Sequence, residues 1–201
     1  MKLSKNTIYV LILLIVVAAL YRLIPMRPAG FAPQMAMALF GGAMIKDKRW
    51  ALSFPIFSLF LSDLLYQGLY MAGVTDIKGI YAGQWQLYFC FLLITVFGFF
   101  LKKINFKNVA LFTISGSGLF FIISNFMVWI GGGGFARPKT IDGLVQCYID
   151  ALIFYRDGGL IHGFAGNFIF GDLFFAAVLF GGYYLIRPKS VAEQQVAYTR
   201  K

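Results

Sequence analysis

The sequence predicts an all-α integral membrane protein, organised as a single transmembrane domain over residues 1–201. Three observations lead to this fold class. The chain is 60% hydrophobic and only 13% charged, and a soluble domain of this length could not bury so much apolar surface. The apolar residues fall into six runs, separated by short clusters of basic residues. The 22 glycines suit helices that pack inside a bilayer, where small residues let backbones approach closely.

The first three transmembrane helices are expected at residues 7–24, 33–45 and 50–73. The first run follows two lysines like a signal peptide, but no small-residue cleavage pattern comes after it, so we expect an uncleaved helix. The second follows the proline-rich stretch IPMRPAGFAP. Its thirteen residues rise only about 20 Å, against a hydrocarbon core of about 30 Å. The third begins at Trp50 and carries Asp63 inside the apolar run.

The last three transmembrane helices are expected at residues 84–101, 109–130 and 160–186. Four consecutive glycines, residues 131–134, follow the fifth run and suggest a hinge. A more polar stretch then places apolar residues at helical spacing, which predicts an amphipathic helix lying along the outer membrane surface. These residues are Ile141, Leu144, Val145, Tyr148, Ile149 and Leu152.

The distribution of charge predicts the orientation. Six crossings put both termini on one side, and that side holds twelve of the 18 lysines and arginines. The positive-inside rule then makes both termini of this multi-pass protein cytoplasmic. The basic residues are not massed on a polar domain, so the net charge of +10 does not indicate nucleic-acid binding.

Polar residues inside the apolar runs converge on one depth. Counting about 1.5 Å per residue from the basic boundaries places Asp63 and Asp172 about 20 Å and 22 Å above the inner side, and Asn125 about 27 Å above it. The short second helix starts at about the same height, with free N–H groups and a partial positive charge. We therefore expect an outward-facing polar pocket for a small polar solute. Its candidate binding residues are Asp63, Gln67, Asn125, Asp172, Gln34 and Asn167.

Two other interpretations of the buried acids remain open. In a non-transporting structural or partner membrane protein, Asp63 and Asp172 would only fix helix packing, through hydrogen bonds to neighbouring helices. They could also bind protons or sodium in a stand-alone, ion-coupled carrier. Neither acid has a basic partner within its own run, although Arg22, Arg27 and Arg156 could approach from the outer side.

The sequence contains no recognised motif for catalysis, metal binding or cofactor binding. The chain has no GxSxG, HExxH or Walker A motif, so we expect no enzyme activity and no cofactor. Cys90 and Cys147 form no CxxC or Cys/His cluster, and His162 is the single histidine. No metal site is expected. Without a nucleotide site, active transport would take its energy from a partner or an ion gradient.

Four stretches resemble a bacterial family of uncharacterised six-span membrane proteins, over nearly all of residues 20 to 186. They are RPAGFAPQMAMALFGGAMIKDKRWALSFPIFSLFLSD, SNFMVWI, GLVQCYIDALIFY and GDLFFAAVLFGG. That family is similar in size and layout to the S components of energy-coupling-factor (ECF) transporters, which capture vitamins and related micronutrients. The resemblance implies a substrate-capturing subunit of the bacterial cytoplasmic (inner) membrane that docks on a transmembrane coupling subunit with ATPase subunits. The alanine pattern through which S components dock is missing from the inner half of the first helix, TIYVLILLIVV.

Overall fold

The computed structural model describes residues 5–25, 27, 30–152 and 167–186. Over these residues the chain is all-helical, as predicted, with no strand. The helices are α1 (Lys5–Arg22), α2 (Gln34–Met44), α3 (Lys48–Met71), α4 (Gln84–Gly98), α5 (Phe106–Gly131), α6 (Ile141–Ala151) and α8 (Asn167–Ile186).

Local sequence signals set several helix ends. The side chains of Asp47, Asn105 and Thr140 each accept a hydrogen bond from a backbone N–H two or three residues further on, at the starts of α3, α5 and α6. Such caps satisfy N–H groups that have no partner within the helix. Helix α5 ends at Gly132, which adopts the left-handed conformation with φ of 75°, as glycine does readily.

Three of the described helices are long and apolar enough to cross a membrane, fewer than the six that the sequence predicts. They are α3, α5 and the Phe168–Leu185 part of α8. Helices α1, α2 and α4 lie within or close to the predicted ranges, but their apolar parts are shorter. The eleven residues of α2 and the fifteen of α4 rise only about 16 Å and 22 Å. Residues 160–166 of the predicted last span lie outside the described part.

Helix α2 lies inside the bundle, in contact with α3, α4, α5 and α8. Nine of its eleven residues are buried. Small residues permit this close packing, since a Cβ atom on Gly42 would fall 2.2 Å from the Thr95 carbonyl oxygen and 2.9 Å from the Gly98 Cα of α4. The surrounding helices expose large apolar side chains, including Leu13, Phe57 and Val178. A surface of this kind is expected for helices that face lipid.

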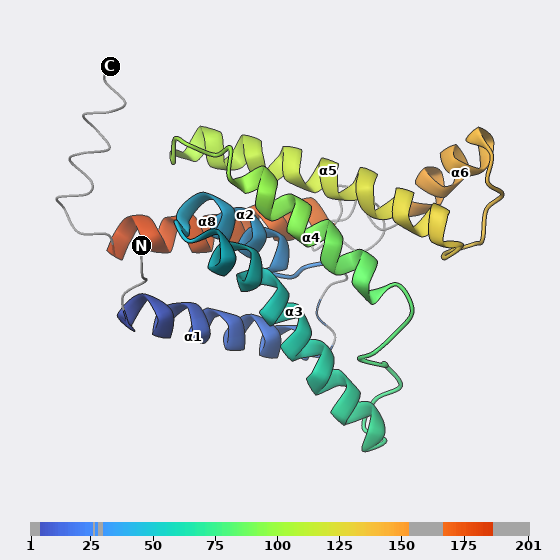
Figure 1. The fold of residues 1–201 in the computed structure, drawn as a ribbon, viewed down its shortest axis with the longest axis horizontal. Helices are drawn as coiled ribbons and strands as arrows, with labels where there is room; N and C mark the ends of the chain where they lie inside the picture. Colours follow the sequence, from blue (N-terminus) through green and yellow to red (C-terminus); the bar gives the residue numbers. More distant parts are fainter. Residues whose placement is uncertain (1–4, 26, 28–29, 153–166, 187–201) are drawn as a thin grey trace.

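Figure 1 shows how the helices are arranged. Helices α1, α3 and α5 run from left to right in the view, and α4 and α8 run the opposite way. The ends of α3 and α5 and the start of α4 therefore lie toward the same end of the molecule, where α6 also packs against α5. The candidate site lies toward this end.

Candidate functional site

Asp63 is the centre of a buried polar cluster that joins three helices. Its Oδ1 accepts a hydrogen bond from Arg22 Nη1 of α1 at 2.9 Å. Its Oδ2 accepts from Gln84 Nε2 at 2.8 Å and from the Tyr88 hydroxyl at 2.6 Å, both on α4. Arg22 also donates to the hydroxyl of Ser62. The carboxylate is only 2% exposed, and its charge is compensated by the guanidinium and by hydrogen bonds to both oxygens.

The connection between α3 and α4 folds back onto α3 beside this cluster. A Cβ atom on Gly79 would fall 1.8 Å from the Asp63 carbonyl oxygen and 2.4 Å from the Gln67 backbone nitrogen, so only glycine fits. Gln67 Oε1 accepts a hydrogen bond from the Ile80 N–H at 3.1 Å. Gln84 Nε2 also lies 3.3 Å from the Gly79 oxygen. Gln67, a predicted binding residue, thus holds the connecting loop.

A cavity of about 190 Å³ lies next to the cluster, and we call it the polar cavity. Its polar lining consists of Arg22, Arg27, Gln34, Ser117 and Asp172. Its apolar walls include leucine and phenylalanine side chains from α3, α4 and α5, namely Leu59, Leu87, Phe91 and Phe120. Residues from six helices and from the α1–α2 connection therefore meet around one small space.

Gln34 has a buried acceptor with no donor. It is the first residue of α2 and 2% exposed. Its Nε2 lies 3.4 Å from the Ala18 carbonyl oxygen and 3.3 Å from Ser58 Oγ. Its Oε1 is the one buried side-chain nitrogen or oxygen without a hydrogen-bond partner in the described part of the chain. Leaving such an acceptor unsatisfied costs about 1–3 kcal/mol.

Asp172 and Arg27 are an acidic and a basic side chain of the polar cavity that form no ion pair with each other. Asp172 is 5% exposed, and the Ser117 hydroxyl donates to its Oδ2. Among the described residues no cation forms an ion pair with it. Within the described part of the chain, Arg27 donates only to backbone oxygens, from Nε to Arg22 at 3.2 Å and from Nη1 to Phe31 at 3.5 Å. Neither partner carries a charge.

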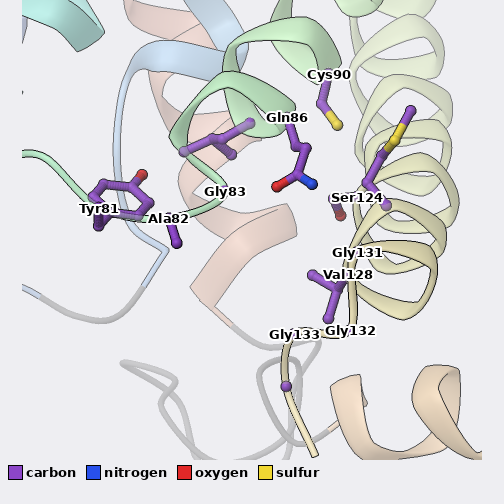
Figure 2. Close-up of a pocket in the computed structure, with 13 residues that line it drawn as sticks. Tyr81, Ala82, Gly83, Gln86, Cys90, Ser124, Val128, Gly131, Gly132 and Gly133 are labelled. Atoms are coloured by element: carbon purple, nitrogen blue, oxygen red, sulfur yellow. The ribbon is translucent and has the colours of Figure 1, made fainter. Parts of the chain in front are cut away.

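A second, larger cavity of about 620 Å³ lies between the start of α4 and the end of α5. We call it the glycine cavity because residues 131–134 and Gly83 line it. Figure 2 shows Gln86, Cys90 and Ser124 on the facing parts of the two helices. Among the described residues, its lining includes no Asp, Glu, Lys or Arg. Burial, followed by the charge of Asp63, raises the pKa of Tyr81, so its phenol is uncharged at neutral pH.

The structure brings together two of the six predicted binding residues, Gln34 and Asp172, in the polar cavity. Asp63 lines neither cavity but is linked to the polar one through Arg22. Asn125 also lines neither, since its Nδ2 donates to the Phe121 oxygen of its own helix at 2.8 Å. Asn167 begins α8, and its side chain lies outside the described part, as do Arg156 and His162. Binding of a solute by any of the six stays a prediction.

Several residues of the site were not predicted from the sequence. Arg22 was expected only as one of three arginines that could approach the acids, and its ion pair with Asp63 confirms that approach. Ser117, Gln84 and Tyr88 were not singled out. The spacing of four residues between Gln84 and Tyr88 puts both on one face of a helix, and this was the available signal. Nothing in the sequence indicates which helix that face meets.

Comparison with family models gives one finding. The model described as Family of unknown function (DUF6580) matches residues 2–195. No curated protein and no solved structure matches the chain. Because the match spans nearly the whole sequence and includes every described helix, the chain belongs to this family of unknown function.

Proposed function

We propose that the protein captures a small polar solute in the polar cavity, as the membrane-embedded binding subunit of a micronutrient uptake transporter. One observation carries this proposal: Gln34, whose Oε1 is buried without a donor in the described part of the chain, lines the same small cavity as Asp172 and Arg27. Buried polar groups in folded proteins almost always have partners. A bound solute would supply the missing donor.

The size and lining of the polar cavity support a small solute. At about 190 Å³ it lies below the range of about 300–1,000 Å³ that is typical for drug-sized ligands. Apolar walls with a few convergent polar groups are the usual composition of a binding site for small molecules.

The proposal includes six membrane crossings, with both termini in the cytoplasm of a bacterial cell. The short helix α2 fits a membrane because protein rather than lipid surrounds it, and its exposed N–H groups then face protein or a cavity. Helix α4 would be accommodated by local thinning of the bilayer or by tilting of its neighbours. The polar cavity would then open toward the outside.

Uptake would need a source of energy, and we propose a transmembrane coupling subunit with ATPase subunits, as in S-component systems. The ion-coupled stand-alone carrier is the weaker candidate. Arg22 already pairs with Asp63, which leaves Asp172 alone of the two acids to bind a coupling ion.

Thermal stabilisation by ligands tests the binding role. The purified protein would be screened against a panel of small polar solutes, and a solute at 100 times its Kd should add about 2.7 kcal/mol of stability. Gln34→Leu and Asp172→Asn should abolish this gain. Asn125→Ala, at a residue that lines neither cavity, is the matched control and should keep it. Stabilisation that survives in both cavity variants would reject the site.

Affinity purification tests the transport partner. The tagged protein should bring down ATPase subunits from the membranes of its own host. If it brings down none, yet moves a solute into liposomes under an ion gradient, the stand-alone carrier replaces the proposed subunit.

A further inference from the structure

Three ionisable side chains line the polar cavity, namely Arg22, Arg27 and Asp172, and their pairing restricts what can bind there. Arg22 is paired with Asp63. Asp172 has no cationic partner among the described residues, and Arg27 has no anionic one. Within the described part of the chain, the cavity therefore offers one acidic and one basic side chain that form no ion pair.

We infer that the polar cavity selects a small zwitterion, an amino-acid-like molecule whose ammonium group meets Asp172 and Gln34 and whose carboxylate meets Arg27. This inference rests on the proposed function, since it names the class of solute for the same cavity.

The ammonium end is matched by two acceptors. An ammonium group has three N–H donors and accepts no hydrogen bond. Gln34 Oε1 has no donor, and the described residues donate to Asp172 only at Oδ2, from Ser117. One ammonium can satisfy both residues, and its positive charge beside the carboxyl group favours the ionised form of Asp172.

The carboxylate end is matched by Arg27. A guanidinium group has five N–H donors and binds carboxylates in a bidentate arrangement. Two of the donor atoms of Arg27, Nε and Nη1, are used on backbone oxygens, and the charge of the group is not neutralised by them. Its Nη2 forms no hydrogen bond with the described residues.

Solutes of other charge types fit less well. A simple amine would leave Arg27 without an anion, and a simple carboxylate would leave the buried Asp172 without a cation. A neutral solute would leave both unpaired. The volume of about 190 Å³ equals that of roughly six water molecules in the liquid, so the two charged ends are joined by a short carbon chain.

Probes that differ in chain length and in which charged end they carry test the inference. Glycine, 3-aminopropanoate and 4-aminobutanoate are the zwitterions, and butanoate and butylamine each lack one charged end of the last. Thermal stabilisation and calorimetric titration of the wild-type protein should show binding of at least one zwitterion, tenfold or more tighter than of butanoate or butylamine. Arg27→Gln and Asp172→Asn should each remove this preference. Arg49→Gln, at an exposed arginine outside the cavity, should leave it unchanged.

The possible results separate the inference from the proposed function. If a neutral polar solute binds in a manner that depends on Gln34 and no zwitterion does, the zwitterion inference is wrong and the capture function stands. Equal affinity for zwitterion, amine and carboxylate would also overturn the inference. If no small solute of any charge stabilises the protein, both the inference and the function fail.

Discussion

At the scale of single residues, Asp63 illustrates how a carboxylate is retained inside an apolar helix. Both of its oxygens accept hydrogen bonds, and one of the donors is the guanidinium of Arg22. A buried charge without a partner would be strongly unfavourable. The cluster joins α1, α3 and α4, so Asp63 contributes to the fold whatever the cavity beside it binds.

Asp63→Asn should destabilise the protein by about 3–5 kcal/mol, because it leaves the Arg22 guanidinium largely buried without its counter-charge. Thermal or denaturant-induced unfolding of the protein in detergent measures this loss. The double variant Arg22→Gln with Asp63→Asn should recover part of it, since no unpaired charge remains. Single and double variants of equal stability would contradict a coupled pair.

The positions of single residues also show how much of the site could be predicted from the sequence. Depth along each helix is readable from the basic boundaries, and it placed Gln34 and Asp172 close enough to share a cavity. The basic boundaries do not show toward which neighbouring helix a side chain points. Asn125 bonds its own helix and Gln67 bonds the neighbouring loop, because tertiary packing decides which face meets which neighbour.

At the scale of elements, α2 depends on close packing of backbones. Gly42 of α2 and Gly98 of α4 lie where the two helices approach most closely. A Cβ atom on Gly98 would fall 2.7 Å from the Leu39 carbonyl oxygen. Such contacts involve backbone atoms, which cannot move aside as a flexible side chain does.

Gly42→Ala should force α2 and α4 apart and destabilise the protein by about 1–3 kcal/mol, the usual range for overpacking. Gly118→Ala is the matched control. A Cβ atom at that α5 position would meet nothing within 4 Å, and alanine favours a helix over glycine by about 1 kcal/mol. The midpoint temperature of thermal unfolding should therefore fall for Gly42→Ala. For Gly118→Ala it should stay level or rise.

Polar contacts attach helix α6 to α5 and to the connection between these two helices. Arg137 Nε and Nη2 donate to the two carboxylate oxygens of Asp150 at 2.8 and 3.0 Å. The Tyr148 hydroxyl donates to the Ile122 oxygen of α5 at 2.9 Å. The sequence predicted the amphipathic helix from its spacing, and the structure places it at Ile141–Ala151 with Ile141, Val145 and Ile149 exposed.

The attachment of α6 should weaken in acid. The hydrogen bonds from Arg137 lower the pKa of Asp150 below its usual value. A group with a lowered pKa stabilises the fold above its unfolded pKa, and this contribution is lost as the pH falls through the lowered value. Hydrogen exchange in α6, corrected for intrinsic rates, should therefore rise as the pH falls below about 4. Asp150→Asn should show no such pH dependence, and an equal rise in both proteins would exclude Asp150 as the cause.

The sequence located the apolar helices well but overestimated some of their lengths. The apolar run predicted at residues 84–101 continues past Gly98, where α4 ends in a turn with the Phe99 N–H bonded to the Val96 oxygen. The hydropathy of the sequence stays high through such a turn because the side chains are still apolar. The number of residues in hydrogen-bonded helix is therefore smaller than the run suggests, and three helices fall short of the length of a full crossing.

At the scale of the whole molecule, the directions of the helices separate their connections into two groups. The connection after α4 lies at the left of Figure 1, and that after α5 lies at the right. If the bundle crosses a membrane, these connections lie on opposite sides of it.

Cysteine labelling tests this arrangement. In a background with Cys90 and Cys147 replaced by alanine, Lys103→Cys and Gly132→Cys should react with a membrane-impermeant thiol reagent from opposite sides. Intact cells should label the second, and only permeabilised cells should label the first. Labelling of both from the same side would exclude the proposed crossing of α5 and the orientation that depends on it.

Among the described residues, Leu87 is the one that lines both the polar cavity and the glycine cavity. Its side chain therefore stands between a small compartment lined by ionisable groups and a larger one whose described lining has none. If the polar cavity binds a solute as proposed, shortening this one side chain should let a longer solute extend toward the glycine cavity without any change to the ionisable groups.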